Sequence, residues 1–215
     1  MTNFEFQMKS SGIIGAGEGA PRAGRPPLLL GSGSPRRRAI LAALGVDFEV
    51  VVADIDEERF PDDAPRTART AALTKHLWLR ERHPGRELLT ADTVVEFEGR
   101  CIVKPRDFDD AVATLVSYSG KPQNVYTGVA YSQAADGGGV QPGPVVRVVK
   151  STVWFKDITP ALAARYVTEA RTLDRAGAYD IDTLGDRIVA SYEGSYTNIV
   201  GLPAELVREL LLLRE

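Results

Sequence analysis

The 215-residue chain is expected to fold as an α/β protein with a curved mixed β-sheet and helices around it. Segments with helical spacing of apolar residues alternate with short apolar runs that are typical of strands. Several consecutive strand-like segments are joined only by short turns or one loop, so they pair antiparallel and make the sheet mixed. A hydrophobic fraction of 44% over this length is enough to bury a core.

The first half of the chain begins with three leucines at 28–30, which predict a short buried strand. A helix follows, because Ser34 is a good N-cap, Pro35 fits the first helical position and Gly45 can take the left-handed conformation beyond the last turn. The elements expected next are a strand running into an acidic turn at 48–58, a helix at 64–85 stopped by Pro84 and Gly85, and strands at 87–99 and 100–105 joined at Glu98 and Gly99.

The second half continues the alternation. Asp107 or Asp109 can cap a helix that ends near Tyr118, and Thr159 with Pro160 starts another. The remaining expected elements are strands at 123–132, 145–155 and 187–194, a Gly/Pro loop at 135–144, a turn-rich stretch at 173–186 and a closing helix from Pro203.

Composition limits the classes of function. A net charge of −3 and a pI near 5.6 argue against general nucleic-acid binding. No apolar run approaches the roughly 20 residues of a membrane span. A single cysteine, Cys101, excludes an internal disulfide and favours a reducing compartment, hence the cytoplasm. Residues 1–27 are rich in Gly, Ala and Pro and predict a disordered extension, which leaves 28–215 as one domain.

Three consecutive arginines, Arg36, Arg37 and Arg38, occupy the first turn of the helix that Ser34 caps. Cations there face the positive end of the helix dipole, at a cost of roughly 0.3–1 kcal/mol each. A bound polyanion removes that conflict, since free backbone N–H groups and guanidinium forks both suit phosphate. The alternative is a solvated basic helix start.

Carboxylates supply the second set of candidates. The acidic turn 54–58 offers oxygen ligands of the kind that Mg²⁺ takes together with substrate phosphates, although a solvated turn has the same composition. Asp92 stands inside an apolar strand, where burial is costly without a partner. It is therefore a candidate general base or metal ligand, and a surface-facing strand residue is the alternative. Cations, carboxylates and a lone acid together indicate metal-assisted hydrolysis of a phosphoanhydride.

These residues also resemble a known family. The blocks LLLGSGSPRRRAILAALG, DIDEE, ADTVV, the Lys104-Pro105 pair, LDRAGAY and GSYTNIVGLP are similar in order and spacing to the Maf family, often labelled septum-formation inhibitors. The likeness runs from about residue 28 to the C-terminus. It implies a fold like that of Maf proteins and inosine triphosphate pyrophosphatases, with two lobes and a central cleft. It also implies a homodimer and a nucleoside triphosphate pyrophosphatase that depends on Mg²⁺, Mn²⁺ or Co²⁺.

The resemblance assigns roles to individual residues. Asp92 would accept the proton of the attacking water and, with Glu57, would hold the metal. The residues implied in binding the substrate triphosphate are Ser34, Arg36, Arg37, Lys75 and Lys104. Of these, Lys75 lies in a stretch, TAALTKHLW, that matches the family's helix motif loosely.

Three positions are implied in base preference: Arg36, Thr93 and Asp182. The first two agree with the family branch that acts on dTTP and UTP, where the third residue is Gln. A carboxylate at that third position suits the adjacent N–H donors of guanine better than the carbonyls of thymine or uracil. Asp182 therefore leaves the base open between pyrimidines and guanine. A non-catalytic nucleotide-binding regulator of cell division is the alternative function.

Overall fold

The computed structural model describes residues 26–135 and 141–212, so the extension expected at 1–27 lies outside the described residues except for its last two prolines. The strands are β1 (Leu28–Gly31), β2 (Phe48–Val50), β3 (Leu88–Phe97), β4 (Arg100–Ile102), β5 (Pro122–Ser132), β6 (Val145–Phe155) and β7 (Val189–Glu193). The helices are α2 (Pro35–Ala43), α3 (Ala64–Arg82), α4 (Phe108–Ser117), α5 (Pro160–Ala170), α6 (Tyr196–Val200) and α7 (Ala204–Leu212), with 3₁₀ turns η1 (Ala176–Ala178) and η2 (Gly185–Arg187).

The predicted helix starts are confirmed by their caps. Ser34 Oγ, Asp107 Oδ1 and Thr159 Oγ1 each accept a hydrogen bond from the backbone N–H three residues later. Gly45 takes a left-handed φ of 71° beyond the end of α2, as expected.

Three strands are shorter than predicted, and one of them, β7, begins at Val189 because the 3₁₀ turn η2 precedes it. β2 ends at Val50, because its partner β1 leaves the sheet after Gly31 to enter α2. β4 ends at Ile102, so the segment to Pro105 is irregular. The short helix α6 was not predicted, since five residues are too few for an apolar period to be visible.

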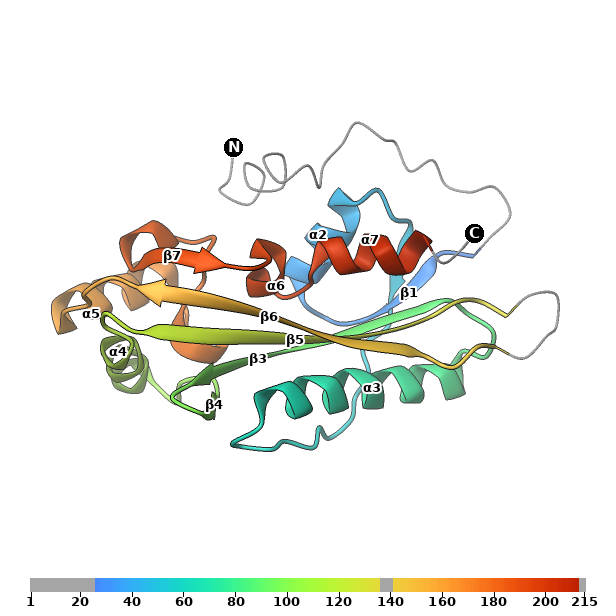
Figure 1. Cartoon of the computed structure of the whole chain (residues 1–215), viewed down its shortest axis with the longest axis horizontal. Helices are drawn as coiled ribbons and strands as arrows, with labels where there is room; N and C mark the ends of the chain where they lie inside the picture. The colour runs from blue at the N-terminus through green and yellow to red at the C-terminus, as the bar shows by residue number, and fades with distance from the viewer. Residues whose placement is uncertain (1–25, 136–140, 213–215) are drawn as a thin grey trace.

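The strands of the described residues form one mixed sheet in the order β2-β1-β3-β5-β6-β7, with β4 paired to β3 outside this order, which confirms the predicted fold class. β1 runs parallel to β2 and β3, and the remaining pairs are antiparallel. Figure 1 shows α3 along one side of the long strands, with α2, α6 and α7 on the other side and α4 and α5 at one end. The long strands β3, β5 and β6 thus connect the α4–α5 end of the molecule with the α2, α6 and α7 side.

One edge of β3 is divided between two partners. β1 pairs with β3 as far as Thr90, and β4 pairs with the same edge only from Val95 onward. Over the four residues between them, β3 has no strand on that side within the described sheet, whereas β5 pairs continuously along the other side. The sheet is therefore open at its edge from 91 to 94, in the middle of the molecule.

Helix α3 packs against the sheet at backbone contact. A Cβ atom added at Gly128 of β5 would lie 2.1 Å from the carbonyl oxygen of Ala68 in α3, so no larger residue fits here. Gly128 pairs with Asp92 on β3. Since Lys75 lies two helical turns beyond Ala68 on the same face of α3, the close approach brings Lys75 over Asp92.

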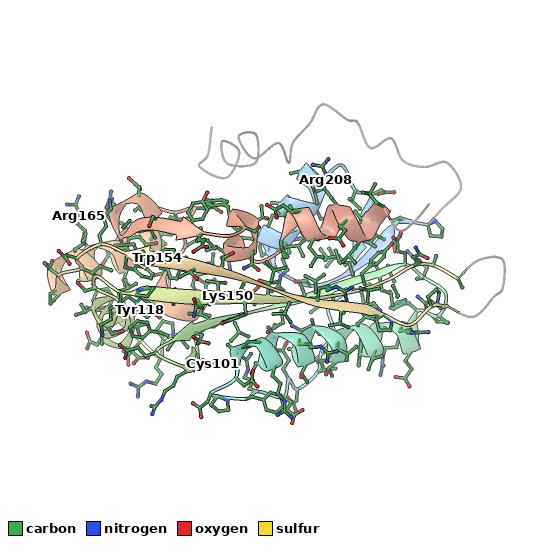
Figure 2. All side chains as sticks on the ribbon, in the orientation of Figure 1. Cys101, Tyr118, Lys150, Trp154, Arg165 and Arg208 are labelled. Carbon is green, nitrogen blue, oxygen red and sulfur yellow. The ribbon has the colours of Figure 1, made fainter. Side chains whose placement is uncertain are left out.

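The main core fills the other face of the sheet and the α4–α5 end. Figure 2 labels Tyr118, which is fully buried there and stacks on Phe155 with ring centroids 5.0 Å apart.

Cys101, also labelled in Figure 2, donates its S–H to Phe60 O at 3.3 Å, and burial raises the pKa of its thiol. A structural cysteine is consistent with both observations. Within 26–135 and 141–212, no helix combines the length and apolarity that crossing a membrane requires.

Candidate functional site

The chain passes from the end of β1 into α2, which places Arg36 and Arg37 beside a pocket. Ser34 Oγ accepts the N–H of Arg37 at 3.5 Å and so begins α2 directly beside the sheet. Arg36 and Arg37 turn toward the sheet and α6, whereas Arg38 is exposed. The alternative of a solvated basic helix start is therefore correct for Arg38 but not for Arg36 and Arg37.

The guanidinium of Arg37 is fixed by three acceptors on three segments. Its Nε donates to Gly201 O at 2.8 Å, its Nη1 to Ser32 Oγ at 2.9 Å and its Nη2 to Thr93 Oγ1 at 3.0 Å. Burial lowers the pKa of Arg37, and the negative charge of Asp92 opposes that shift. The cation is thus held in a set orientation before any ligand binds.

Arg36 is held in a different direction. Its Nε donates to Val200 O at 3.1 Å, and its Nη1 lies 3.3 Å from Asp180 Oδ2. Burial lowers the pKa of Arg36, as does the nearby cation Arg175, and Asp180 counteracts both. Arg36 and Arg37 are adjacent in α2 but have different charged neighbours. Asp92 acts on Arg37, whereas Asp180 and Arg175 act on Arg36.

A lysine links the two carboxylates that the sequence suggested. Lys75 Nζ lies 2.6 Å from Glu57 Oε1 and 2.8 Å from Asp92 Oδ1. All three side chains are between 12% and 19% exposed, so water screens them little. The buried Asp92 is therefore not a surface-facing strand residue, and the acidic turn is not merely solvated at Glu57.

Asp92 and Thr93 point to opposite faces of β3, as neighbours in a strand must. Asp92 meets Lys75 of α3, whereas Thr93 meets Arg37 and lies 3.3 Å from Gly201 O beside α6. Both residues lie in the interval where the edge of β3 has no strand partner. The cluster of Lys75 and its carboxylates therefore lies across the strand from the arginines, and the charges of Asp92 and Glu57 act on Arg37.

A pocket of about 440 Å³ occupies the Thr93 side of this edge. It is bounded by α2 and α6 on one side and by the segment 174–181 on the other. Its polar lining residues are Ser34, Arg36, Arg37, Thr93, Lys104, Asp174, Arg175, Tyr179 and Asp180. This volume suits a small organic ligand, and its cations suit an anionic one.

The predicted site residues fall into two groups and one outlier. Ser34, Arg36, Arg37, Thr93 and Lys104 line the pocket, and Glu57, Lys75 and Asp92 form the adjoining cluster. Asp182 is not among the lining residues. Its Oδ1 accepts a hydrogen bond from the hydroxyl of Tyr196, and burial raises the pKa of this carboxyl.

Asp180 and Arg175 are pocket residues that the sequence did not single out. They lie in a turn-rich stretch, 173–186, where no period tells which side chains face inward. The available signal was the acidic pair in YDID, of which only the second acid, Asp182, was considered. The fold instead directs Asp180 into the pocket lining.

A divalent cation fits the cluster only with further ligands. Among the described residues, no group of three or more His, Cys, Asp or Glu side chains is arranged to hold a metal. Glu57 and Asp92 already share one cation, the Lys75 ammonium, so their oxygens are close enough to serve a common positive charge. Two carboxylates completed by substrate phosphates are an ordinary arrangement for Mg²⁺.

The fold and the site define an α/β protein with a pocket rich in cationic side chains at the open edge of a mixed sheet. Comparison with known proteins then identifies the family: residues 27–213 match the model of the Maf-like proteins, so the chain belongs to that family. The dTTP/UTP pyrophosphatase of Deinococcus radiodurans is 39% identical over 191 residues, which are 89% of this chain and 94% of that protein. The dTTP/UTP pyrophosphatase of Desulfotalea psychrophila is 37% identical over 86% of this chain and 93% of its own.

Similarity to solved structures is weaker. The Staphylococcus aureus Ham1 protein matches 62% of this chain and 72% of its own with 12% identity and a TM-score of 0.38. This partial likeness adds no residue-level information.

Proposed function

We propose that this protein is a nucleoside triphosphate pyrophosphatase that hydrolyses dTTP, UTP or modified nucleotides to a nucleoside monophosphate and pyrophosphate. The observation that carries the proposal is Asp92, a buried carboxylate held by Lys75 beside a pocket that contains fixed arginines. Family membership and relatives named dTTP/UTP pyrophosphatase support it. A protein that only binds nucleotides has no need of such an acid, which disfavours the regulator alternative.

Different residues bind the triphosphate, accept the proton of the attacking water and orient the proton acceptor. Arg37, Ser34 and Lys104 bind the triphosphate, and Arg37 does so without reorganisation because its guanidinium is already fixed. Asp92 accepts a proton from the attacking water, whose oxygen forms a bond to the α-phosphorus while the bridging oxygen leaves with pyrophosphate. Lys75 orients the Asp92 carboxylate through its 2.8 Å contact.

Glu57 and Asp92 are the residues that would hold a divalent cation such as Mg²⁺, Mn²⁺ or Co²⁺. When bound, the metal would neutralise charge on the phosphates and act as a Lewis acid. The remaining ligands would come from substrate phosphates and water, because the described residues offer only two carboxylates here.

We further propose, from the family resemblance, that the protein is a cytoplasmic homodimer. Light scattering coupled to size-exclusion chromatography measures the oligomeric state, and a monomer at micromolar concentration would contradict this part of the proposal.

The test of the activity is pyrophosphate release from canonical and modified nucleoside triphosphates, each with Mg²⁺, Mn²⁺ or Co²⁺. We expect monophosphate and pyrophosphate as products and the highest rates on dTTP and UTP. Asp92→Asn should lower kcat by about 10²-fold or more while nucleotide binding persists, because the amide keeps the size and loses the basicity. Glu96→Gln on the same strand is the control. Equal rates for Asp92→Asn and the wild type would refute the role of Asp92.

A further inference from the structure

The pocket has two chemically different ends. Arg37 lies within the fields of Asp92 and Glu57, whereas Arg36 lies within those of Arg175, Asp180, Asp174 and Asp182. Phosphates and a divalent cation belong at the first end, since that is where the paired carboxylates and Lys75 lie. The base of a bound nucleotide therefore extends toward the second end.

At this second end, one carboxylate oxygen joins two guanidiniums. Asp180 Oδ2 lies 3.3 Å from Arg36 Nη1 and 3.3 Å from Arg175 Nε. The Asp180 side chain is 11% exposed, so this contact is sheltered from water. Without Asp180, the like charges of Arg36 and Arg175 would lack the carboxylate that they share, and among the described residues Arg175 would keep only Asp174 as a partner in an ion pair.

Asp180 is itself held rigidly. Its Oδ1 accepts the backbone N–H of Asp182 at 3.0 Å, and its own N–H donates to the Tyr166 hydroxyl at 3.1 Å. The same hydroxyl donates to Asp180 O at 2.9 Å, and Tyr166 is fully buried in α5. The position of the carboxylate is thus set by a buried tyrosine of α5, and the carboxylate in turn orients an arginine of α2.

The fixed Arg36 keeps donors available to a ligand. Its Nε is taken by Val200 O and its Nη1 by Asp180, and within the described residues Nη2 has no acceptor. A guanidinium N–H that projects into the pocket suits a carbonyl oxygen on the edge of a base. We propose that Asp180 is a positioning residue for base recognition, which fixes Arg36 at the base end of the pocket; this inference rests on the proposed function.

The proposal separates two ligands that share their phosphates. Inorganic tripolyphosphate carries the triphosphate without a base, so its binding should not depend on Asp180. For Asp180→Asn we expect KM for the best nucleoside triphosphate to rise about ten-fold with kcat within about three-fold, because the lost contact orients a binding group and takes no part in bond breaking. Inhibition by tripolyphosphate should stay within about two-fold of the wild type by the same reasoning.

Two further variants make the test specific. Asp186→Asn removes an exposed carboxylate from the same turn-rich segment and should change neither constant. In a double-mutant cycle, Asp180→Asn should add little to Arg36→Gln, because Asp180 acts through Arg36. Asp180→Glu, which keeps the charge and displaces it by one methylene, should fold even if the amide does not and should show the same KM effect in smaller degree.

The outcomes distinguish this inference from the proposed function. A wild-type KM in folded Asp180→Asn, an equal loss of tripolyphosphate inhibition, or additivity with Arg36→Gln would each overturn the role of Asp180. Absence of pyrophosphate release by the wild type would count against the proposed function instead. In that case, titration calorimetry with a nucleotide and with tripolyphosphate still tests the role of Asp180. It measures whether Asp180→Asn weakens binding of the nucleotide without weakening binding of tripolyphosphate.

Discussion

The ammonium of Lys75 lies between the carboxylates of Glu57 and Asp92, 2.8 Å from the oxygen of the latter. A lysine on a helix, an acid in an irregular turn and an acid in a strand thereby form one cluster at the open edge of β3. The Lys75 charge stabilises two acids that would otherwise repel each other in a poorly hydrated position.

Lys75→Met should expose that repulsion. Each lost charge-assisted hydrogen bond contributes roughly 1.5–3 kcal/mol, so the melting temperature should fall by several degrees. Millimolar Mg²⁺ should raise the melting temperature of this variant more than that of the wild type, because the divalent ion then replaces the missing charge. Lys121→Met, which removes an exposed partner of Glu98, is the control. Equal Mg²⁺ shifts in wild type and Lys75→Met would contradict the prediction.

Arg37→Lys should be costly although the charge is kept. The ammonium cannot reach Gly201 O, Ser32 Oγ and Thr93 Oγ1 together, so about 2 kcal/mol of stability and about 10²-fold in kcat/KM should be lost. Calorimetric unfolding and steady-state kinetics measure the two effects. The same replacement at the exposed Arg38 should have little effect. Wild-type stability and kcat/KM in Arg37→Lys would show that only the charge matters, which would contradict the prediction.

Gly128→Ala, a substitution in β5, should disturb the contact between Lys75 and Asp92. The new methyl group would lie 2.1 Å from Ala68 O, so α3 must move away from the sheet and carry Lys75 from Asp92. Overpacking of this kind costs about 1–3 kcal/mol. Gly143→Ala, where nothing lies within 4 Å of the new methyl group, is the matched control. We expect kcat to fall in the first variant alone, and unchanged stability and turnover there would refute the close packing.

The stability of the protein should fall between pH 6.5 and pH 4 because of His76. This side chain is fully buried in α3, its Nε2 is bonded to Ser132 Oγ at 2.9 Å, and burial lowers its pKa to about 4. The unfolded chain therefore takes up the proton first, and stability that is complete above pH 6.5 is lost as the pH falls toward 4. The difference amounts to about 3 kcal/mol at the lower limit.

Denaturant titrations from pH 4 to pH 8 measure this slope. His76→Asn should remove most of it whatever its effect on stability at neutral pH, whereas His83→Asn at the end of α3 should leave it in place. A slope that survives the first substitution would assign the pH dependence to other groups.

The sequence predicted the parts of the site that depend on local rules. The cap at Ser34 and the apolar run around Asp92 are visible within a few residues, because a cap and a strand period are short-range signals. Family resemblance supplied Glu57 and Lys75. Asp180 was missed because its orientation is set by Tyr166, 14 residues away, and the approach at Gly128 was missed because it is a contact between distant segments.

The open interval in β3 has a consequence for how the chain can vary. Asp92 and Thr93 serve one site from two sides only because successive residues of a strand alternate in direction. An insertion or deletion of one residue upstream in β3 would turn the carboxylate to the face of Arg37 and the hydroxyl to the face of Lys75. The segment between Thr90 and Val95 can therefore change by replacement but not in length, because its spacing decides which side chain lies on which face of the sheet.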